Sequence, residues 1–326
     1  MGTRLPPLLA AFLFLGLLLA CTPRLLFAQS PDSPAYIALG DSLAAGIGAT
    51  NPATDGYVGL TATALRQGHY SESGLALVNL AVPGAKSGDL LAPGGQLDKA
   101  LAEIGRRQEG GGDDDVELIS IDIGGNDLLA LAAPGSPCLQ NPAGRVCLEA
   151  LSEMLGRLQF NLSQVLGGLH EAAPGARIYV LDLYNPYSGT GDVLEPLADA
   201  AVQQLNGVVR ATVAGLGREQ VNLASVDDLF QGRGKQWVAA DHIHPNDNGH
   251  LVISEVLLGA ILDREPQIPR ELLDVPPDNA RARADADPGS AAAADGDTPL
   301  WLIVAIPAAF VAGAALSGAY FLARGR

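Results

Sequence analysis

The chain has 326 residues, a formal net charge of −16 and 48% hydrophobic residues. The acidic excess, with few clustered Lys and Arg side chains, argues against nucleic acid or an anionic membrane surface as the partner. Between two apolar ends lie roughly 245 residues, which is enough for one well-packed α/β domain and short for two.

Residues 1–28 predict a signal peptide. Arg4 forms a short basic segment, and the apolar residues 8–20 suit a signal peptide better than a membrane span because the run is too short. Residues 18–21 resemble a bacterial lipobox, in which Cys21 would be lipidated and become the new N-terminus. Cleavage near Ala28 would instead discard this cysteine, and both alternatives predict export.

Strand and helix patterns alternate through the middle of the chain. Buried strands are predicted at residues 36–40, 75–82, 116–123, 177–183 and 221–225, and helices at 56–67, 96–107, 148–173 and 194–216, with a last amphipathic run that ends near Leu262. This alternation implies a parallel sheet with helices on both faces.

The first strand leads directly to a candidate nucleophile. Gly40 breaks the apolar run, and an Ala/Leu pattern typical of a helix begins just after Ser42. The serine would then lie at the carboxyl edge of the sheet, where open α/β sheets bind ligands and a helix N-terminus offers free N–H groups to negative charge. The alternative is that Asp41 or Ser42 only caps the helix.

Gly84 and Asn126 follow the second and third strands at the same edge. At Gly84 the backbone could approach a ligand without an intervening side chain, or the residue could be an ordinary turn glycine. Asn126 could cap the next helix, and its side-chain amide could also donate a hydrogen bond into the site.

Asp241 and His244 form a candidate acid–base pair. A spacing of three residues lets the two side chains meet on one turn, so that the carboxylate accepts from one ring nitrogen and the other nitrogen is free for a serine. Pro245 suits the first position of the following helix. A rival interpretation is a metal site, whose ligands would be Asp241, His242, His244 and His250, but it leaves the three strand-edge residues unexplained.

Cys138 and Cys147 are the only close cysteine pair in the exported region. They lie in a Pro/Gly-rich insertion, residues 132–147, and the expected oxidising compartment makes a disulfide the leading interpretation. The acidic loop 110–115 joins two elements, with calcium binding as an alternative.

The C-terminal region predicts a membrane anchor. Residues 276–299 have the composition of a disordered linker. Residues 300–323 are uncharged and almost wholly apolar, and Arg324 and Arg326 follow them, so we expect a transmembrane helix with a cytoplasmic tail at 324–326.

The ordered motifs resemble those of the GDSL-type, or SGNH, serine hydrolases, which include secreted bacterial lipases and esterases. The matching residues are Gly40-Asp41-Ser42-Leu43, Gly84, Gly124-Gly125-Asn126-Asp127 and the pair Asp241 and His244. The resemblance covers residues 36–262 and implies a three-layer α/β/α flavodoxin-like fold for a domain at 30–275, with a five-stranded parallel sheet in the order 2-1-3-4-5.

The resemblance also implies a reaction. Ser42 would be the nucleophile, His244 the general base and Asp241 its orienting carboxylate, and the oxyanion hole would consist of the N–H groups of Ser42 and Gly84 and the amide of Asn126. We expect hydrolysis of carboxylic esters through an acyl-enzyme, with no metal or organic cofactor. Alternatives of the same fold are a thioesterase, a lysophospholipase and a carbohydrate deacetylase.

An alternative of another class is a catalytically inactive, membrane-tethered binding module. For either class we expect a single-pass protein of the cell membrane whose main domain is extracytoplasmic and monomeric. A small-molecule ester is the expected partner of the enzyme, and no nucleic acid is expected to bind.

Overall fold

A computed structural model of the chain describes residues 33–110, 115–216 and 220–274. The predicted signal peptide 1–28 with Cys21, most of the acidic loop, the linker 276–299, the membrane helix 300–323 and the tail 324–326 lie outside these residues. Within the described ranges, no helix is both long and apolar enough to cross a membrane.

Five strands form one parallel sheet in the order β2-β1-β3-β4-β5, as the resemblance implied. Their bounds are Ala35–Gly40 (β1), Ala76–Asn79 (β2), Val116–Asp122 (β3), Arg177–Leu181 (β4) and Val221–Ala224 (β5). Since all neighbours are parallel, the carboxyl ends of the strands meet at one edge of the sheet.

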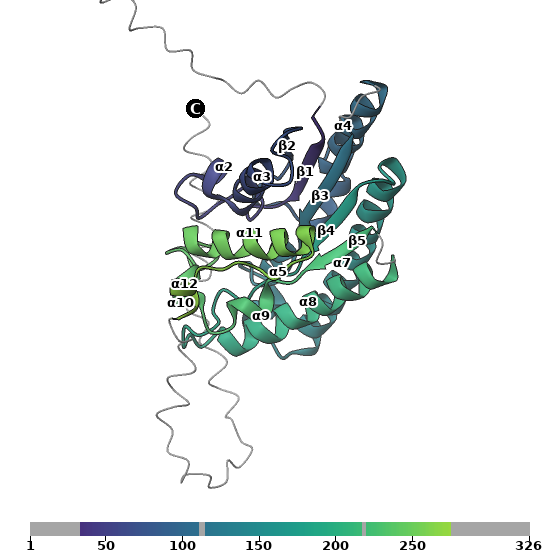
Figure 1. The fold of residues 1–326 in the computed structure, drawn as a ribbon. Helices are drawn as coiled ribbons and strands as arrows, with labels where there is room; N and C mark the ends of the chain where they lie inside the picture. Colours follow the sequence, from purple (N-terminus) through teal and green to yellow (C-terminus); the bar gives the residue numbers. More distant parts are fainter. Residues whose placement is uncertain (1–32, 111–114, 217–219, 275–326) are drawn as a thin grey trace, which may run out of the picture. The chain divides into compact units, whose positions relative to one another are not determined.

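In the described part of the chain, five longer helices cover the sheet (Figure 1). They are Tyr57–Gln67 (α3), Gln96–Gly110 (α4), Arg145–Ala172 (α7), Glu195–Gly215 (α8) and Asp247–Leu262 (α11). Shorter helical segments are Pro52–Asp55 (α2), Ser87–Leu91 (η1), Gly125–Leu131 (α5), Pro137–Gln140 (α6), Asp227–Phe230 (α9), Gly234–Trp237 (α10) and Arg270–Leu273 (α12).

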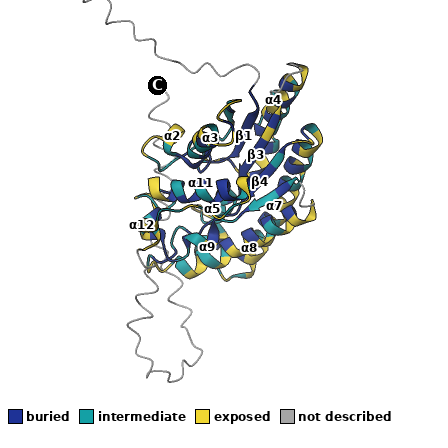
Figure 2. Cartoon of the chain, in the orientation of Figure 1, coloured by how far each residue is buried: buried dark blue, intermediate teal, exposed yellow. Residues whose placement is uncertain are grey.

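Strand β1 shows how the sheet separates two hydrophobic layers. Ala35, Ile37 and Leu39 belong to one cluster, and Tyr36 and Ala38 belong to the other, because successive strand side chains point to opposite faces. The first cluster includes apolar residues of α4, α7 and α8, and the second includes those of α3 and α11. Figure 2 shows β1 and β3 in the dark blue of buried residues between these layers.

The helix predicted just after Ser42 is wrong. The segment is instead a series of turns, in which Gly46 N–H donates to Leu43 O at 3.0 Å and Ile47 N–H donates to Ser42 O at 2.9 Å. Gly46 has a φ of 80°, and a Cβ atom there would lie 2.1 Å from Pro52 O. A left-handed glycine packed against another backbone segment interrupts the helical pattern.

Two other local predictions need correction. Helix α11 begins at Asp247, after the N-cap Asn246, whose side chain accepts from Gly249 N–H at 3.1 Å; Pro245 therefore precedes the cap and pairs with Val238 in an antiparallel bridge. The N-cap of α5 is Gly124, so Asn126 lies inside that helix and does not cap it. Its side-chain amide is consequently available for contacts across the sheet edge.

Candidate active site

Ser42, His244 and Asp241 form one continuous chain of hydrogen bonds. Ser42 Oγ lies 2.8 Å from His244 Nε2, and His244 Nδ1 lies 2.6 Å from Asp241 Oδ2. Because an ionised carboxylate can only accept, Nδ1 carries the hydrogen and Nε2 is left to accept the hydroxyl proton of Ser42. The fold thus joins a residue after β1 to one before α11, 202 positions apart in the chain.

The backbone around His244 is fixed on both sides of the ring. Ala239 N–H donates to His244 O at 2.8 Å, and Tyr184 Oη donates to Ile243 O at 2.7 Å. His244 is only 7% exposed, whereas Ser42 is half-buried. His244 is therefore more shielded from solvent than Ser42.

Asp241 is held in its ionised form. Its Oδ1 accepts the N–H groups of Ile243 and His244, both at 3.0 Å, in a turn closed by its own side chain. Burial alone would raise the pKa of this carboxyl group, but the hydrogen bonds from the His244 ring and from the two N–H groups outweigh it and lower the pKa to about 2. Asp241 can therefore orient His244 and stabilise a positive charge on its ring.

The N–H groups of Ser42 and Gly84 are candidate donors to an oxyanion. Within the part of the chain that the structure describes, neither N–H donates to a protein acceptor. Gly84 is exposed in the turn that follows β2, at the same edge of the sheet as Ser42. Two unengaged backbone donors at this edge are suited to binding negative charge.

The side-chain amide of Asn126 is engaged, which the sequence did not predict. Asn126 Nδ2 donates to Asp41 Oδ2 at 3.0 Å and to Ala85 O at 3.1 Å, which occupies both of its hydrogens. The amide therefore connects the Ser42 turn to the residue after Gly84. Donation to a bound oxyanion would require one of these two bonds to be shared.

Two buried side chains that sequence reasoning missed support the Ser42 turn. Gln96 of α4 accepts from Gly40 N–H at 2.8 Å and donates to Gly40 O at 2.7 Å. Asp122, at the end of β3, is 2% exposed and accepts from Tyr57 Oη at 3.0 Å. An aspartate at the end of a strand rich in Val, Leu and Ile was the signal available in the sequence.

His250 also connects α11 to the Ser42 turn. Its Nε2 lies 3.0 Å from Ile47 O, so this nitrogen carries the hydrogen, and its Nδ1 accepts from Tyr57 N–H at 3.2 Å. The side chain is fully buried, and burial lowers the pKa of the ring to about 4. His250 is therefore neutral, and its two ring nitrogens hold the backbone at Ile47 and Tyr57 in place.

The remaining histidines, His69, His170 and His242, are not part of the hydrogen-bonded chain of Ser42, His244 and Asp241. His242 is exposed and adopts a left-handed φ of 60°, and His69 and His170 are exposed on other elements. Among the described residues there is no cluster of His, Cys, Asp and Glu side chains that could hold a metal ion. Asp241, His242, His244 and His250 do not form the alternative metal site, because both ring nitrogens of His250 are hydrogen-bonded to backbone groups.

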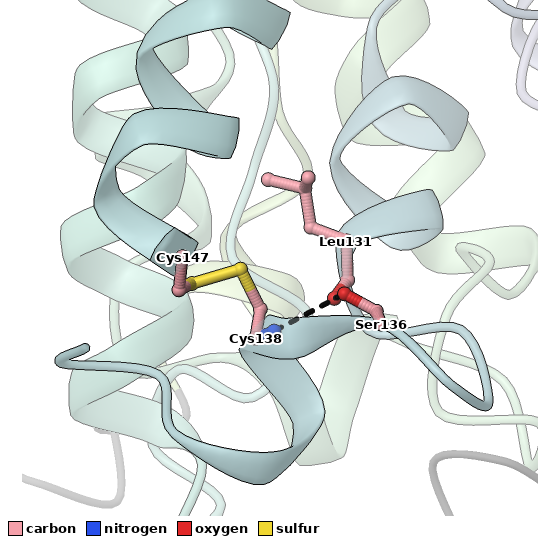
Figure 3. Close-up of a disulfide and its surroundings, with 4 residues drawn as sticks. All are labelled: Leu131, Ser136, Cys138 and Cys147. Atoms are coloured by element: carbon pink, nitrogen blue, oxygen red, sulfur yellow. Dashed lines mark hydrogen bonds between the residues drawn. A yellow bond between two sulfur atoms is a disulfide. The ribbon is translucent and has the colours of Figure 1, made fainter. Parts of the chain in front are cut away.

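A disulfide joins Cys138 and Cys147, as the sequence predicted, with their Cα atoms 4.6 Å apart. Figure 3 shows that it links α6 to the first turn of α7, and that Ser136 Oγ contacts Leu131 O at the end of α5. The insertion is therefore attached to the helix that carries Asn126.

A cavity of about 210 Å³ lies beside the Gly84 turn. Its lining residues are Val82, Pro83, Gly84, Ala85, Asp89, Gly95, Gln96 and Lys99. The cavity shares Gly84 with the predicted oxyanion hole but includes no member of the hydrogen-bonded triad.

Comparisons with known proteins agree with this architecture. A family model described as the GDSL-like lipase/acylhydrolase family matches residues 38–252. No curated protein matches the chain. A lipase from a goat rumen metagenome is 23% identical with a TM-score of 0.53, covering 70% of this chain and 97% of the other. An extracellular lipase from Streptomyces rimosus is 24% identical with a TM-score of 0.51, covering 70% and 100%. These likenesses are evidence of a shared fold.

Proposed function

This chain belongs to the GDSL-like lipase/acylhydrolase family, and we propose that it is a serine esterase that hydrolyses carboxylic esters through an acyl-enzyme. The observation that carries the proposal is the hydrogen-bonded chain from Ser42 through His244 to Asp241. Such a chain supplies a nucleophile, a base within reach of its proton and a carboxylate that orients the base.

In the proposed acylation step, Ser42 Oγ attacks the ester carbonyl carbon and passes its proton to His244 Nε2. Asp241 holds the Nδ1 hydrogen and stabilises the imidazolium that forms. When the tetrahedral intermediate collapses, the C–O bond to the alcohol breaks and His244 gives its proton to the leaving oxygen. A water molecule then repeats the sequence on the acyl-enzyme, releasing the acid and restoring Ser42.

The N–H groups of Ser42 and Gly84 would stabilise the oxyanion of each tetrahedral intermediate, because they are not used elsewhere in the described structure. Asn126 would supply a third donor by sharing the hydrogen that now contacts Ala85 O. Removing one such donor typically costs about 10²-fold to 10³-fold in kcat.

We propose short or medium acyl esters as the substrates. A long acyl chain gains about 0.8 kcal/mol for each methylene that it buries, which requires a deep apolar channel. The insertion offers few large apolar side chains, and Val146 and the adjoining Leu148 are 57% and 54% exposed. They point to an open surface and not to a channel wall.

We also propose that the domain lies outside the cell membrane, tethered by residues 300–323. The disulfide between Cys138 and Cys147 supports an oxidising compartment. Protease added to intact cells should release an active soluble fragment by cutting within residues 276–299. If release requires broken cells, the orientation is reversed.

The proposed activity is tested with the full-length protein in detergent. A fluorophosphonate probe should label the wild-type chain and leave Ser42→Ala unlabelled, and only the wild type should hydrolyse p-nitrophenyl acetate. Circular dichroism of both proteins controls for folding. Equal hydrolysis by the two proteins would refute the role of Ser42.

A further inference from the structure

Two buried carboxyl groups lie side by side beneath the Ser42 turn. Asp41 is 6% exposed and Asp122 is 2% exposed, and their carboxyl groups are close enough to interact directly. Asp41 directly precedes Ser42, and Asp122 pairs in register with Gly40 across β1 and β3. The space is tight, because a Cβ atom on Gly40 would lie 2.0 Å from Asp122 Oδ1.

A direct hydrogen bond between two carboxyl groups requires a proton on one of them, since two carboxylates are both acceptors only. Burial raises the pKa of Asp41 to about 6. Burial, and then the adjacent charge of Asp41, raise the pKa of Asp122 well above its ordinary range. Two ionised groups in contact at this depth would repel one another strongly.

The surroundings of the two carboxyl groups, and above all the proximity of His244 to Asp41, favour the negative charge on Asp41. Its Oδ1 accepts from Leu43 N–H at 3.0 Å and its Oδ2 accepts from Asn126 Nδ2 at 3.0 Å. Asp41 also lies within electrostatic reach of His244, whose positive charge would favour an anion there. Asp122 accepts from Tyr57 Oη and from the Ala44 N–H, and a protonated Asp122 carboxyl group could donate its hydrogen to Asp41.

We propose that Asp41 and Asp122 share one proton at neutral pH, held on Asp122, and that this pair positions the oxyanion donor Asn126 and the turn that follows Ser42. The inference rests on the proposed function for its catalytic consequence but not for the shared proton itself. Asp122 is thus a positioning residue, because it acts on Asn126 through Asp41.

Among the described residues, the other titratable groups that interact with the pair are three tyrosines and His244. Burial raises the pKa values of Tyr36, Tyr57 and Tyr184, so all three hydroxyls stay neutral through the neutral range. Tyr36 Oη is hydrogen-bonded to Ser120 at 2.7 Å and donates no bond to either carboxyl group. The tyrosines therefore contribute no change of charge to the pair at neutral pH.

Loss of the shared proton would disrupt the site. Two adjacent carboxylates would lose their mutual hydrogen bond and move apart, and Asp41 would carry with it the contacts to Leu43 and Asn126. We therefore expect kcat to fall on the alkaline side when the pair loses its proton, with little change in KM, because an oxyanion donor acts mainly in the transition state.

Infrared spectroscopy of the full-length protein labelled with ¹³C-aspartate tests the proton without using activity. At neutral pH the wild type should show the carbonyl band of a protonated carboxylic acid, and Asp122→Asn should lack it. Asp227→Asn is the matched control, because Asp227 is also buried with a raised pKa but lies outside this pair. A band that survives in Asp122→Asn, or no band in the wild type, would overturn the shared proton.

Activity measurements test the location of the proton. Asn at position 122 can still donate to Asp41, so Asp122→Asn should keep kcat within about threefold and lose the alkaline decline due to the pair. Asp41 accepts hydrogen bonds on both oxygens, from Leu43 N–H and from Asn126 Nδ2. Asparagine has only one oxygen, so Asp41→Asn loses one of these bonds and should lower kcat on the order of 10²-fold. A larger loss of kcat in Asp122→Asn than in Asp41→Asn would overturn the assignment of the proton to Asp122. An inactive wild type with the infrared band intact would refute the proposed function alone.

Discussion

His250 should limit the stability of the domain in acid. The ring is fully buried, donates from Nε2 to Ile47 O and accepts the Tyr57 N–H at Nδ1. Protonation would place a hydrogen on Nδ1 opposite another N–H donor. The folded state therefore excludes the proton, and the pKa of His250 is lowered from 6.5 to about 4 by burial.

The sign and size of the effect follow from proton linkage. Above the unfolded pKa both states are neutral at His250, so there is no penalty. Below it the unfolded chain binds the proton first, and stability falls by about 1.36 kcal/mol for each pH unit until the folded pKa is reached. A difference of roughly 2.5 units corresponds to a loss of about 3 kcal/mol between about pH 6.5 and pH 4.

Asp41 contributes with the opposite sign. Its folded pKa is raised to about 6, so it weakens the folded state as the pH rises through this range and strengthens it on acidification. The pH dependence of the folding stability of the wild type would therefore combine the contributions of Asp41 and His250. A comparison with a variant that lacks only the imidazole separates them.

His250→Gln is that variant, because glutamine keeps a neutral donor and acceptor and does not titrate. Urea unfolding at pH values from about 7 to about 4 should show the wild type losing about 3 kcal/mol relative to His250→Gln. His69→Gln, the same change at an exposed histidine, controls for the loss of a surface imidazole. Parallel stability curves for the wild type and His250→Gln would refute the reasoning.

Three further outcomes are expected. Asn126→Ala should lower kcat by about 10²-fold to 10³-fold with the fold intact, and an unchanged kcat would remove Asn126 from the oxyanion hole. Reduction of Cys138–Cys147 should lower the free energy of unfolding by about 2–3 kcal/mol and alter kcat/KM, as denaturation and rate measurements with and without reductant can check. The kcat/KM for p-nitrophenyl esters should peak at short or medium chains; a steady rise through about twelve carbons would reveal an apolar channel.

The sequence predicted the parts of the site that depend on local spacing. Asp241 and His244 could be paired from three residues of separation, and the order of the sheet followed from the family resemblance. Gly84 and Asn126 were placed at the sheet edge because strand ends are visible as changes from apolar to turn-forming residues. These features need only neighbouring residues or a recognised motif.

The contacts that support the site could not be predicted in the same way. Gln96 bonds to Gly40 from 56 residues away, and Asp122 accepts from Tyr57 across 65 residues. Periodicity does not specify which buried polar groups will meet, because that depends on how helices pack against the sheet. The mistaken helix after Ser42 has a related cause, since the turn is set by the close approach of Gly46 to the Pro52 backbone.

The 202-residue separation of Ser42 and His244 has a consequence for biogenesis. The Ser42 turn is synthesised near the start of the domain, whereas His244 and His250 are among the last folded residues to emerge. Until α11 docks against α3, Ser42 has no partner to take its proton and Ile47 has no bond from His250. Under the proposed function, a nascent chain would therefore be hydrolytically silent, and activity would appear only when the two ends of the domain have come together.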